Sequence, residues 1–279
     1  MHLPIIISRF SNLLFFAQKT GWHHNENFNP SFYGKSENKI WKQIEKSIGK
    51  QNTKQIKKTI APARPNFVSH WYKVSKHLFL WKQYFQNNGL LFQQIIFDAK
   101  KLSGIKNFAI SKVPIYLISN PSDKDREINA WFSWMPKETF IVVEIPLGFR
   151  VPNNFFPLGV LVHEFFHLML RENKNLFSKI SKIAKENEKI FTKLSEGMPN
   201  RIFLEELLIS SFIPEGYLSE KYFNTKVVTY NLKPQDLLGW RKLVASKLHG
   251  TAREYLNNAQ RIDKNYLVCI TSFIKQNVK

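Results

Sequence analysis

The amino-acid sequence predicts an α+β protein that is mostly helical and has one small, mainly antiparallel sheet. Three observations predict this class. Most of the chain before residue 103 and after residue 154 repeats its apolar residues every three or four positions, which is the period of an amphipathic helix. Between these stretches, three short runs rich in β-branched and aromatic residues are separated by turn signals. With 279 residues, 43% of them hydrophobic, the chain is also long enough to bury a sizeable core.

Residues 35–60 form the first predicted helix. Ile40 and Ile44 mark its apolar face, lysines recur every three or four residues along another face, and Gly49 interrupts it. A stripe of lysines is more often the solvated face of an amphipathic helix than a surface for phosphates or a membrane. Residues 1–34, which precede this helix, show no clear period.

Prolines at positions 62 and 65 break the helix and mark the best linker in the chain. We therefore predict two regions. Residues 1–66 form an N-terminal helical and irregular region that includes the basic helix, and residues 67–279 form a larger body. Within the body, residues 67–102 predict two aromatic-rich helices, split at the Asn-Asn-Gly sequence of residues 87–89.

Three strands are predicted next, at residues 113–118, 128–134 and 139–145. The short Met-Pro-Lys turn at residues 135–137 predicts that the last two strands form a hairpin. The remaining chain is predicted to be helical again. Its helices span residues 154–172, 176–194 and 200–213, a short stretch after Pro214, and a long C-terminal stretch from about Pro234.

Positive charge dominates the composition, because 41 Lys and Arg residues against 21 Asp and Glu residues give a formal net charge of +20. Such a field attracts polyanions such as nucleic acid or anionic lipid. Most of the excess is lysine, and it accompanies abundant Asn, Ile and Phe, a composition typical of drift in an AT-rich genome. We therefore favour a solvated basic surface, and nucleic acid is a possible partner that we do not favour.

A single cysteine, Cys269, excludes an intramolecular disulfide scaffold and a thiolate metal cluster. Its apolar neighbours, Val268 and Ile270, predict an inert thiol in the core. The longest apolar stretch near the start, residues 5–17, is broken by polar residues, so neither a signal peptide nor a transmembrane helix is predicted. We expect a cytoplasmic protein, and the sequence leaves its oligomeric state open.

Residues 160–167 read Val-Leu-Val-His-Glu-Phe-Phe-His and contain an HExxH motif. His163 and His167 lie one turn apart on the same face of the predicted helix, so both imidazoles can reach one Zn²⁺ at roughly 2.0–2.1 Å. Glu164 is offset from this pair and can accept a proton from zinc-bound water without ligating the ion. The surrounding residues are apolar, and metal ligation is one of the few ways to satisfy two buried imidazoles together.

The motif, the hairpin before it and the helices before the hairpin resemble the zincin metallopeptidases over about residues 67–222. The resemblance implies a zincin-like catalytic domain at residues 67–279, one Zn²⁺ per chain, and a peptide or protein substrate. It also implies an edge strand beside the HExxH helix that holds extended substrate by strand addition, either residues 139–145 or residues 128–134.

The third metal ligand lies outside the motif. The metzincin pattern HExxHxxGxxH fails, because Leu170 and Asn173 occupy its glycine and histidine positions, so a gluzincin-like downstream Glu is the natural candidate. The strongly apolar helix at residues 200–213 has only two acids, the adjacent Glu205 and Glu206, and carboxylates buried there need a partner.

Among these acids we favour Glu206, because the small Ser210 one turn later lets that side of the helix approach the HExxH helix closely. Glu205 has the bulkier Ile209 at the equivalent position. Glu215, in a Pro-Glu-Gly setting similar to the segment that carries the third ligand in some gluzincins, is the next candidate. The group that orients the ligand histidines stays unidentified.

Hydrolysis of a peptide bond also builds negative charge on the scissile carbonyl oxygen, which needs a stabilising group. Tyr217, just beyond the ligand helix, is the first candidate, and His249 is the second. The sequence therefore predicts a zinc metallopeptidase that acts through a zinc-bound water with Glu164 as general base. The alternative is a non-catalytic basic protein that binds nucleic acid or a membrane surface and in which the HExxH helix is structural.

Overall fold

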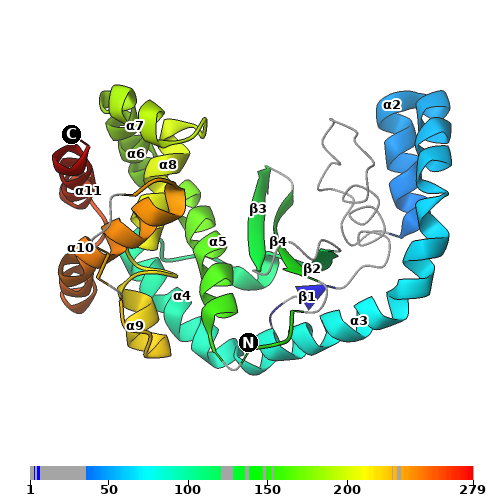
Figure 1. The fold of residues 1–279 in the computed structure, drawn as a ribbon, viewed down its shortest axis with the longest axis horizontal. Coiled ribbons are helices and arrows are strands. Elements are labelled where there is room, and N and C mark those ends of the chain that lie inside the picture. The colour runs from blue at the N-terminus through cyan, green and yellow to red at the C-terminus, as the bar shows by residue number, and fades with distance from the viewer. Residues whose placement is uncertain are drawn as a thin grey trace. The chain divides into compact units, whose positions relative to one another are not determined.

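The structure, a computed structural model, confirms a mostly helical α+β fold with one small sheet (Figure 1). The described residues are 3, 5–6, 36–120, 128–135, 138–146, 149–152, 154–227, 229–230 and 234–278.

Two compact units divide the chain. Unit 1 comprises residues 1–89 and 109–153, and unit 2 comprises residues 90–108 and 154–279. The units do not follow the predicted boundary at residue 66. Because most of residues 1–34 lie outside the described residues, the predicted regions 1–66 and 67–279 stay a prediction.

Two long helices lie in unit 1, α2 (Glu37–Ile60) and α3 (Ala63–Asn87). Gly49 interrupts α2 as the sequence predicts, because its φ of 83° lies in the left-handed region that glycine adopts without a steric cost. The predicted linker is reduced to a short turn between the helices. Pro65 lies in the first turn of α3, where its missing N–H leaves no helical hydrogen bond unmade.

The sheet of unit 1 has the strand order β1-β2-β4-β3. Its strands are β1 (Ile5–Ile6), β2 (Ile115–Asn120), β3 (Asn129–Met135) and β4 (Glu138–Pro146). β3 and β4 form the predicted antiparallel hairpin, but β2 runs parallel to both β1 and β4. The prediction of a mainly antiparallel sheet is therefore wrong. The chain passes from β2 to the outer strand β3 and only then turns back, so β4 enters between them in the direction of β2.

This strand order decides between the two candidate substrate strands. β4 has β2 on one side and β3 on the other, so its backbone groups are already paired. β3 is paired only with β4 among the described strands. Of these two candidates, β3 is the one with an edge open to a further strand among the described residues, and its role beside the HExxH helix stays a prediction.

Unit 2 is built of helices, most of α4 included. They are α4 (Gly89–Ser103), α5 (Phe156–Glu172), α6 (Lys174–Glu186), α7 (Glu188–Leu194), α8 (Asn200–Ser210), α9 (Tyr217–Phe223), α10 (Leu237–Asn257) and α11 (Lys264–Asn277). α5 and α9 match the predicted helices, and α8 ends three residues earlier than predicted.

Two predicted long helices are each divided in two. The helix predicted at residues 176–194 ends at Asn187, whose side chain donates a hydrogen bond to the Ile183 carbonyl at 2.7 Å, and α7 starts anew. The C-terminal helix is divided into α10 and α11. The Asp263 side chain caps α11 by accepting the Tyr266 N–H at 3.0 Å, which favours a new helix start.

Aromatic packing holds α5 in the core of unit 2. Phe165 contacts Phe92 and Phe108 edge-on, and the neighbouring Phe166 packs against Phe212. α5 also packs against α6 and α8, and α8 packs against α10. These contacts place the HExxH helix between α4 and the segment after it, which precede α5 in the chain, and helices that follow it.

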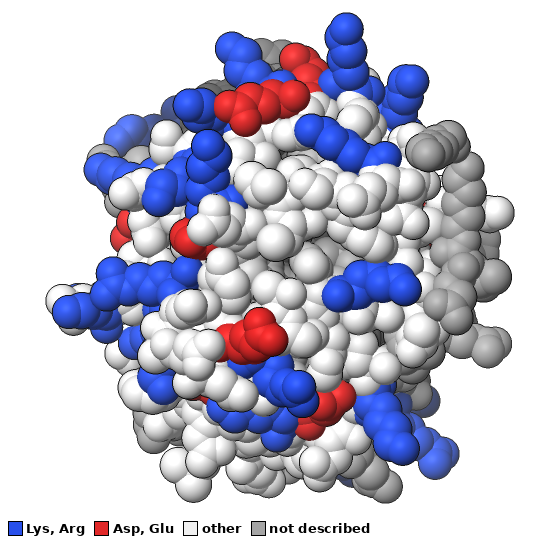
Figure 2. All heavy atoms as spheres, turned by 90° about the vertical axis from the view of Figure 1, so that its left-hand side faces the viewer, with Lys and Arg blue, Asp and Glu red and all other residues white. Residues whose placement is uncertain are grey.

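Two of the predictions concern the surface: the burial of Cys269 and the distribution of the positive charge. Cys269 is exposed, so the prediction of a buried, inert thiol is wrong. α11 turns Tyr266, Ile270 and Ile274 inward at helical spacing, and Cys269 falls on another face. On the side drawn in Figure 2, Lys and Arg side chains are scattered with Asp and Glu among them and form no single patch, which is typical of a solvated surface. Among the described helices, none is long and apolar enough to cross a membrane.

Candidate metal centre

The HExxH motif lies in the middle of α5, on a turn that is almost wholly buried. His163, Glu164 and His167 expose 4%, 8% and 3% of their surface. Both imidazoles come from the same face of the helix, and their ring centroids lie 4.8 Å apart. The helix thus brings two polar rings into an apolar core, where each nitrogen needs a partner.

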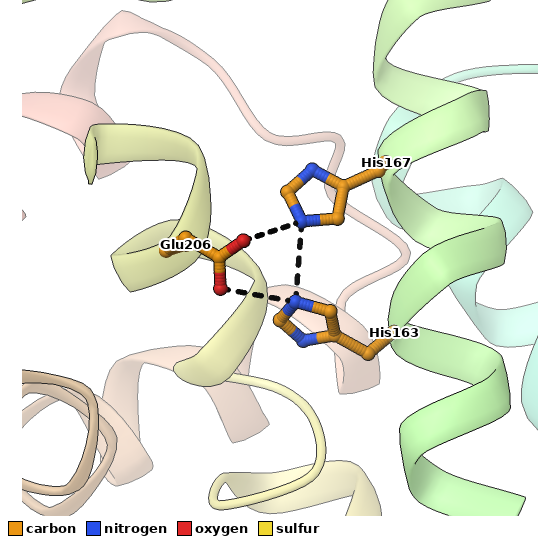
Figure 3. Close-up of side chains that lie close together, drawn as sticks. All are labelled: His163, His167 and Glu206. Atoms are coloured by element: carbon orange, nitrogen blue, oxygen red, sulfur yellow. Dashed lines mark hydrogen bonds and ion pairs between the residues drawn. The ribbon is translucent and has the colours of Figure 1, made fainter. Parts of the chain in front are cut away.

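Glu206 of α8 faces both imidazoles (Figure 3). Its Oε1 lies 3.0 Å from His167 Nε2, and its Oε2 lies 3.2 Å from His163 Nε2. The two Nε2 atoms are 3.1 Å from each other. The structure therefore brings together the three predicted ligands, and these residues could hold a metal ion.

The spacing of these atoms fits a small divalent ion. Ligand atoms at about 2.0–2.1 Å from a tetrahedral zinc ion lie about 3.3 Å from one another. The two Nε2 atoms are 3.1 Å apart, close to that value, and each lies 3.0–3.2 Å from a different oxygen of Glu206. Taking one ligand atom from each residue, the three atoms lie within 4.8 Å of one another. Each of the three groups also offers a lone pair, and without a cation or a proton between them such groups repel one another. The chemistry and the spacing of the donor set therefore fit a metal ion.

The far side of the His163 ring is held by a backbone carbonyl. His163 Nδ1 lies 3.2 Å from the carbonyl oxygen of Ile213, just beyond α8, so Nδ1–H can donate there and leave the Nε2 lone pair facing Glu206. Gly159, one turn before His163, makes this approach possible. A Cβ on Gly159 would lie only 3.2 Å from Pro214 Cβ, so the chain beyond α8 lies directly against α5.

Glu205 holds the other ring. Its Oε2 lies 3.3 Å from His167 Nδ1, and its Oε1 accepts a hydrogen bond from Arg201 one turn earlier on α8. Glu205 is fully buried. It contacts Nδ1 of His167 rather than the Nε2 that faces His163 and Glu206, which is the position from which a carboxylate can orient a metal-binding imidazole and which sequence reasoning left unassigned. The spacing of Arg201 and Glu205, four residues apart on an apolar helix, was the signal that could have found it.

Buried charge shifts the pKa values of this cluster in the metal-free protein. Burial raises the pKa of Glu164. Burial lowers the pKa of His167, but its hydrogen bonds to Glu205 and Glu206 outweigh that effect and raise the pKa to about 10. Burial also raises the pKa of Glu206, but the neighbouring His163 and His167 hold it well below its usual range. In the absence of metal, a proton on His167 thus offsets the charge of Glu206.

Glu215, the second candidate ligand, lies elsewhere. Both of its oxygens contact Arg241 Nη2, Oε1 at 2.9 Å and Oε2 at 3.2 Å. Arg241 comes from α10, and its Nη1 lies 3.5 Å from Glu206 Oε2. Sequence reasoning missed Arg241, and no local pattern marks it, because it reaches the centre only through the packing of α10 on α8.

Tyr217 and His249, the two candidates for stabilising the oxyanion, lie against each other. Their ring centroids are 5.4 Å apart in an edge-to-face arrangement. His249 Nε2 lies 3.1 Å from Glu220 Oε2. The catalytic roles of Tyr217 and Glu164 stay predictions.

A comparison of the chain with protein-family models, curated proteins and solved structures finds no match.

Proposed function

We propose that this protein is a zinc-dependent peptidase whose centre is His163, His167 and Glu206. The observation that supports it best is the convergence of two imidazole nitrogens and a carboxylate within 3.2 Å of one another in a buried site. Among the described residues three side chains form the candidate ligand set, and three protein ligands with an open fourth position are the arrangement of catalytic rather than structural zinc sites. A structural site would be closed by a fourth side chain.

The identity of the metal is inferred from the ligand types. Two imidazoles and one carboxylate suit Zn²⁺, whereas Ca²⁺ and Mg²⁺ prefer oxygen ligands alone. The charges support a divalent cation as well. Glu205 is paired with Arg201, and Glu215 makes the closer contact with Arg241, so among the described residues Glu164 and Glu206 remain as the carboxylates beside the imidazoles that these cations balance least. A doubly charged ion balances them.

When bound, Zn²⁺ supplies Lewis-acid chemistry and activates a water molecule. Glu164 is the group that moves the proton. Its raised pKa, caused by burial, brings the carboxylate closer to the value that suits a general base at neutral pH. The same carboxyl group then delivers the proton to the leaving amine. We assign peptide or protein as the substrate and the cytoplasm as the location on the sequence expectations above.

Elemental analysis and one isosteric variant test the proposal. The purified protein should contain about one zinc per chain, and it should cleave members of a library of quenched fluorescent peptides. Glu164→Gln should keep zinc and fold but lose at least ~10²-fold in hydrolysis, because general acid–base steps contribute that much. The proposal is overturned if the protein binds no metal when reconstituted with Zn²⁺. Loss of zinc from Glu164→Gln would instead make Glu164 a ligand and remove its catalytic role.

A further inference from the structure

Each ligand of the proposed zinc site has an outer partner, but the three partners differ in kind. A backbone carbonyl holds His163, and a carboxylate, Glu205, holds His167. Glu206 instead faces a cation, Arg241, with Nη1 3.5 Å from Oε2. A cation beside a metal ligand is electrostatically unfavourable for metal binding, so its presence needs a reason.

Glu215 supplies that reason. Its two oxygens lie 2.9 Å and 3.2 Å from Arg241 Nη2, closer than Glu206 lies to Nη1. The Glu215 carboxylate therefore balances the guanidinium charge, and it fixes the planar group by two contacts on one nitrogen. Both side chains are largely buried, with 20% of Arg241 and 13% of Glu215 exposed. A neutral, rigid pair can hold a metal ligand without opposing the metal.

The geometry points to Arg241 as a positioning residue of the metal centre, anchored by Glu215 and holding Glu206 in the orientation that faces both imidazoles. The side chain of Glu206 has three torsions that can rotate its oxygens away from the histidines, and the contact of Arg241 Nη1 with Oε2 restrains them. Arg241 Nε is buried and has no hydrogen-bond partner among the described residues, so this N–H of the guanidinium group can still donate a hydrogen bond. This inference rests on the proposed zinc site.

Zinc affinity measured by competition with a chromophoric chelator tests the inference. Arg241→Ala removes the positioning group, and Glu215→Gln removes the anchor while leaving an unbalanced cation beside Glu206. Each variant should lose about 10- to 100-fold in zinc affinity, as expected when the outer partner of a ligand is lost. Arg253→Ala, an exposed arginine on the same helix, is the matched control and should bind zinc like the parent.

A second measurement separates positioning from mere stabilisation of the fold. Co²⁺ bound in place of zinc reports ligand geometry through its visible absorption. The spectrum should change in Arg241→Ala and Glu215→Gln and stay unchanged in Arg253→Ala. A variant that is only less stable keeps the parent spectrum and affinity while folded, and that result for both variants overturns the inference. A parent protein that binds no zinc overturns the proposed function and, with it, this inference; a parent that binds zinc confines the failure to Arg241.

Discussion

Two largely buried carboxylates of unit 2, Asp98 on α4 and Glu206 on α8, are surrounded in opposite ways. Asp98 accepts hydrogen bonds from Tyr222 Oη at 2.6 Å and Lys221 Nζ at 2.7 Å, and Lys101 Nζ lies 3.4 Å away. All three neighbours are donors. Glu206 instead has one donor, Arg241, at the longer distance of 3.5 Å, and two closer imidazole nitrogens that each offer a lone pair when only the far nitrogen carries a proton.

The difference shows how a structural carboxylate and a candidate metal ligand are told apart without a bound ion. A carboxylate among donors is satisfied by the protein alone. A carboxylate that faces two imidazole lone pairs is satisfied on that side only when a cation or a proton joins the group. The Asp98 cluster links α4 to α9 and has its donors within the protein, whereas the Glu206 cluster needs a cation or a proton between the carboxylate and the imidazole nitrogens.

The largest expected effect is zinc-dependent stability that only one of the two clusters controls. Chelator-stripped protein should gain about 4 kcal/mol in free energy of unfolding at a free zinc concentration ~1,000-fold above the dissociation constant. Urea unfolding with and without zinc measures the gain. His163→Ala should abolish it, and Asp98→Ala should keep it. An equal gain in His163→Ala would place the zinc elsewhere in the chain.

A smaller effect is expected at the Asp98 cluster itself. Asp98→Ala should lower the free energy of unfolding by about 1–3 kcal/mol, because it leaves the Tyr222 hydroxyl and the Lys221 ammonium without their acceptor. The loss should be the same with and without zinc. Zinc affinity should stay within about twofold of the parent, as for independent sites whose effects add. A variant that loses zinc would show that the two clusters are coupled.

The smallest expected effect is a proton count. The raised pKa of His167, about 10, predicts that this side chain is a charged imidazolium, with a proton on both ring nitrogens, at neutral pH in the metal-free protein. Zinc binding should therefore release at least about one proton per ion at pH 7, measured by titration calorimetry in buffers of different ionisation enthalpy. No release at this pH would mean that His167 is neutral before zinc binds.

The same shift sets the pH dependence of the metal-free fold. A His pKa raised above its unfolded value of about 6.5 contributes stability that is fully present below pH 6.5 and is lost as the pH rises towards 10. The metal-free protein should therefore become less stable over this range. Zinc-loaded protein should not show this loss, because the ion takes the place of the proton.

Local sequence was enough to predict α5 and its motif, because both depend on spacing within one helix. It was also enough to choose Glu206, since adjacent residues on a helix point about 100° apart and only one can face the metal. The sheet was harder. The parallel pairing of β2 with β4 depends on the path of the chain between them, which no local pattern records.

The outer partners of the centre could not be predicted for a similar reason. Arg241 lies 35 positions after Glu206, and the carbonyl of Ile213 has no side-chain signature at all. At Cys269, by contrast, a local pattern was present but led to a wrong prediction. Its neighbours in sequence suggested burial, but the inward face of α11 is set by residues three and four apart, and Cys269 is exposed.

One contiguous segment, residues 201–215, supplies most of the polar groups described around the two histidines of the HExxH turn. It carries the proposed ligand Glu206, the Glu205–Arg201 pair behind His167, the Ile213 carbonyl behind His163, and Glu215. The proposed ligand and most of its supporting groups could therefore be transferred to another protein together, by packing one HExxH helix against one copy of this segment. Only the arginine opposite Glu215 must then be provided by the new host scaffold.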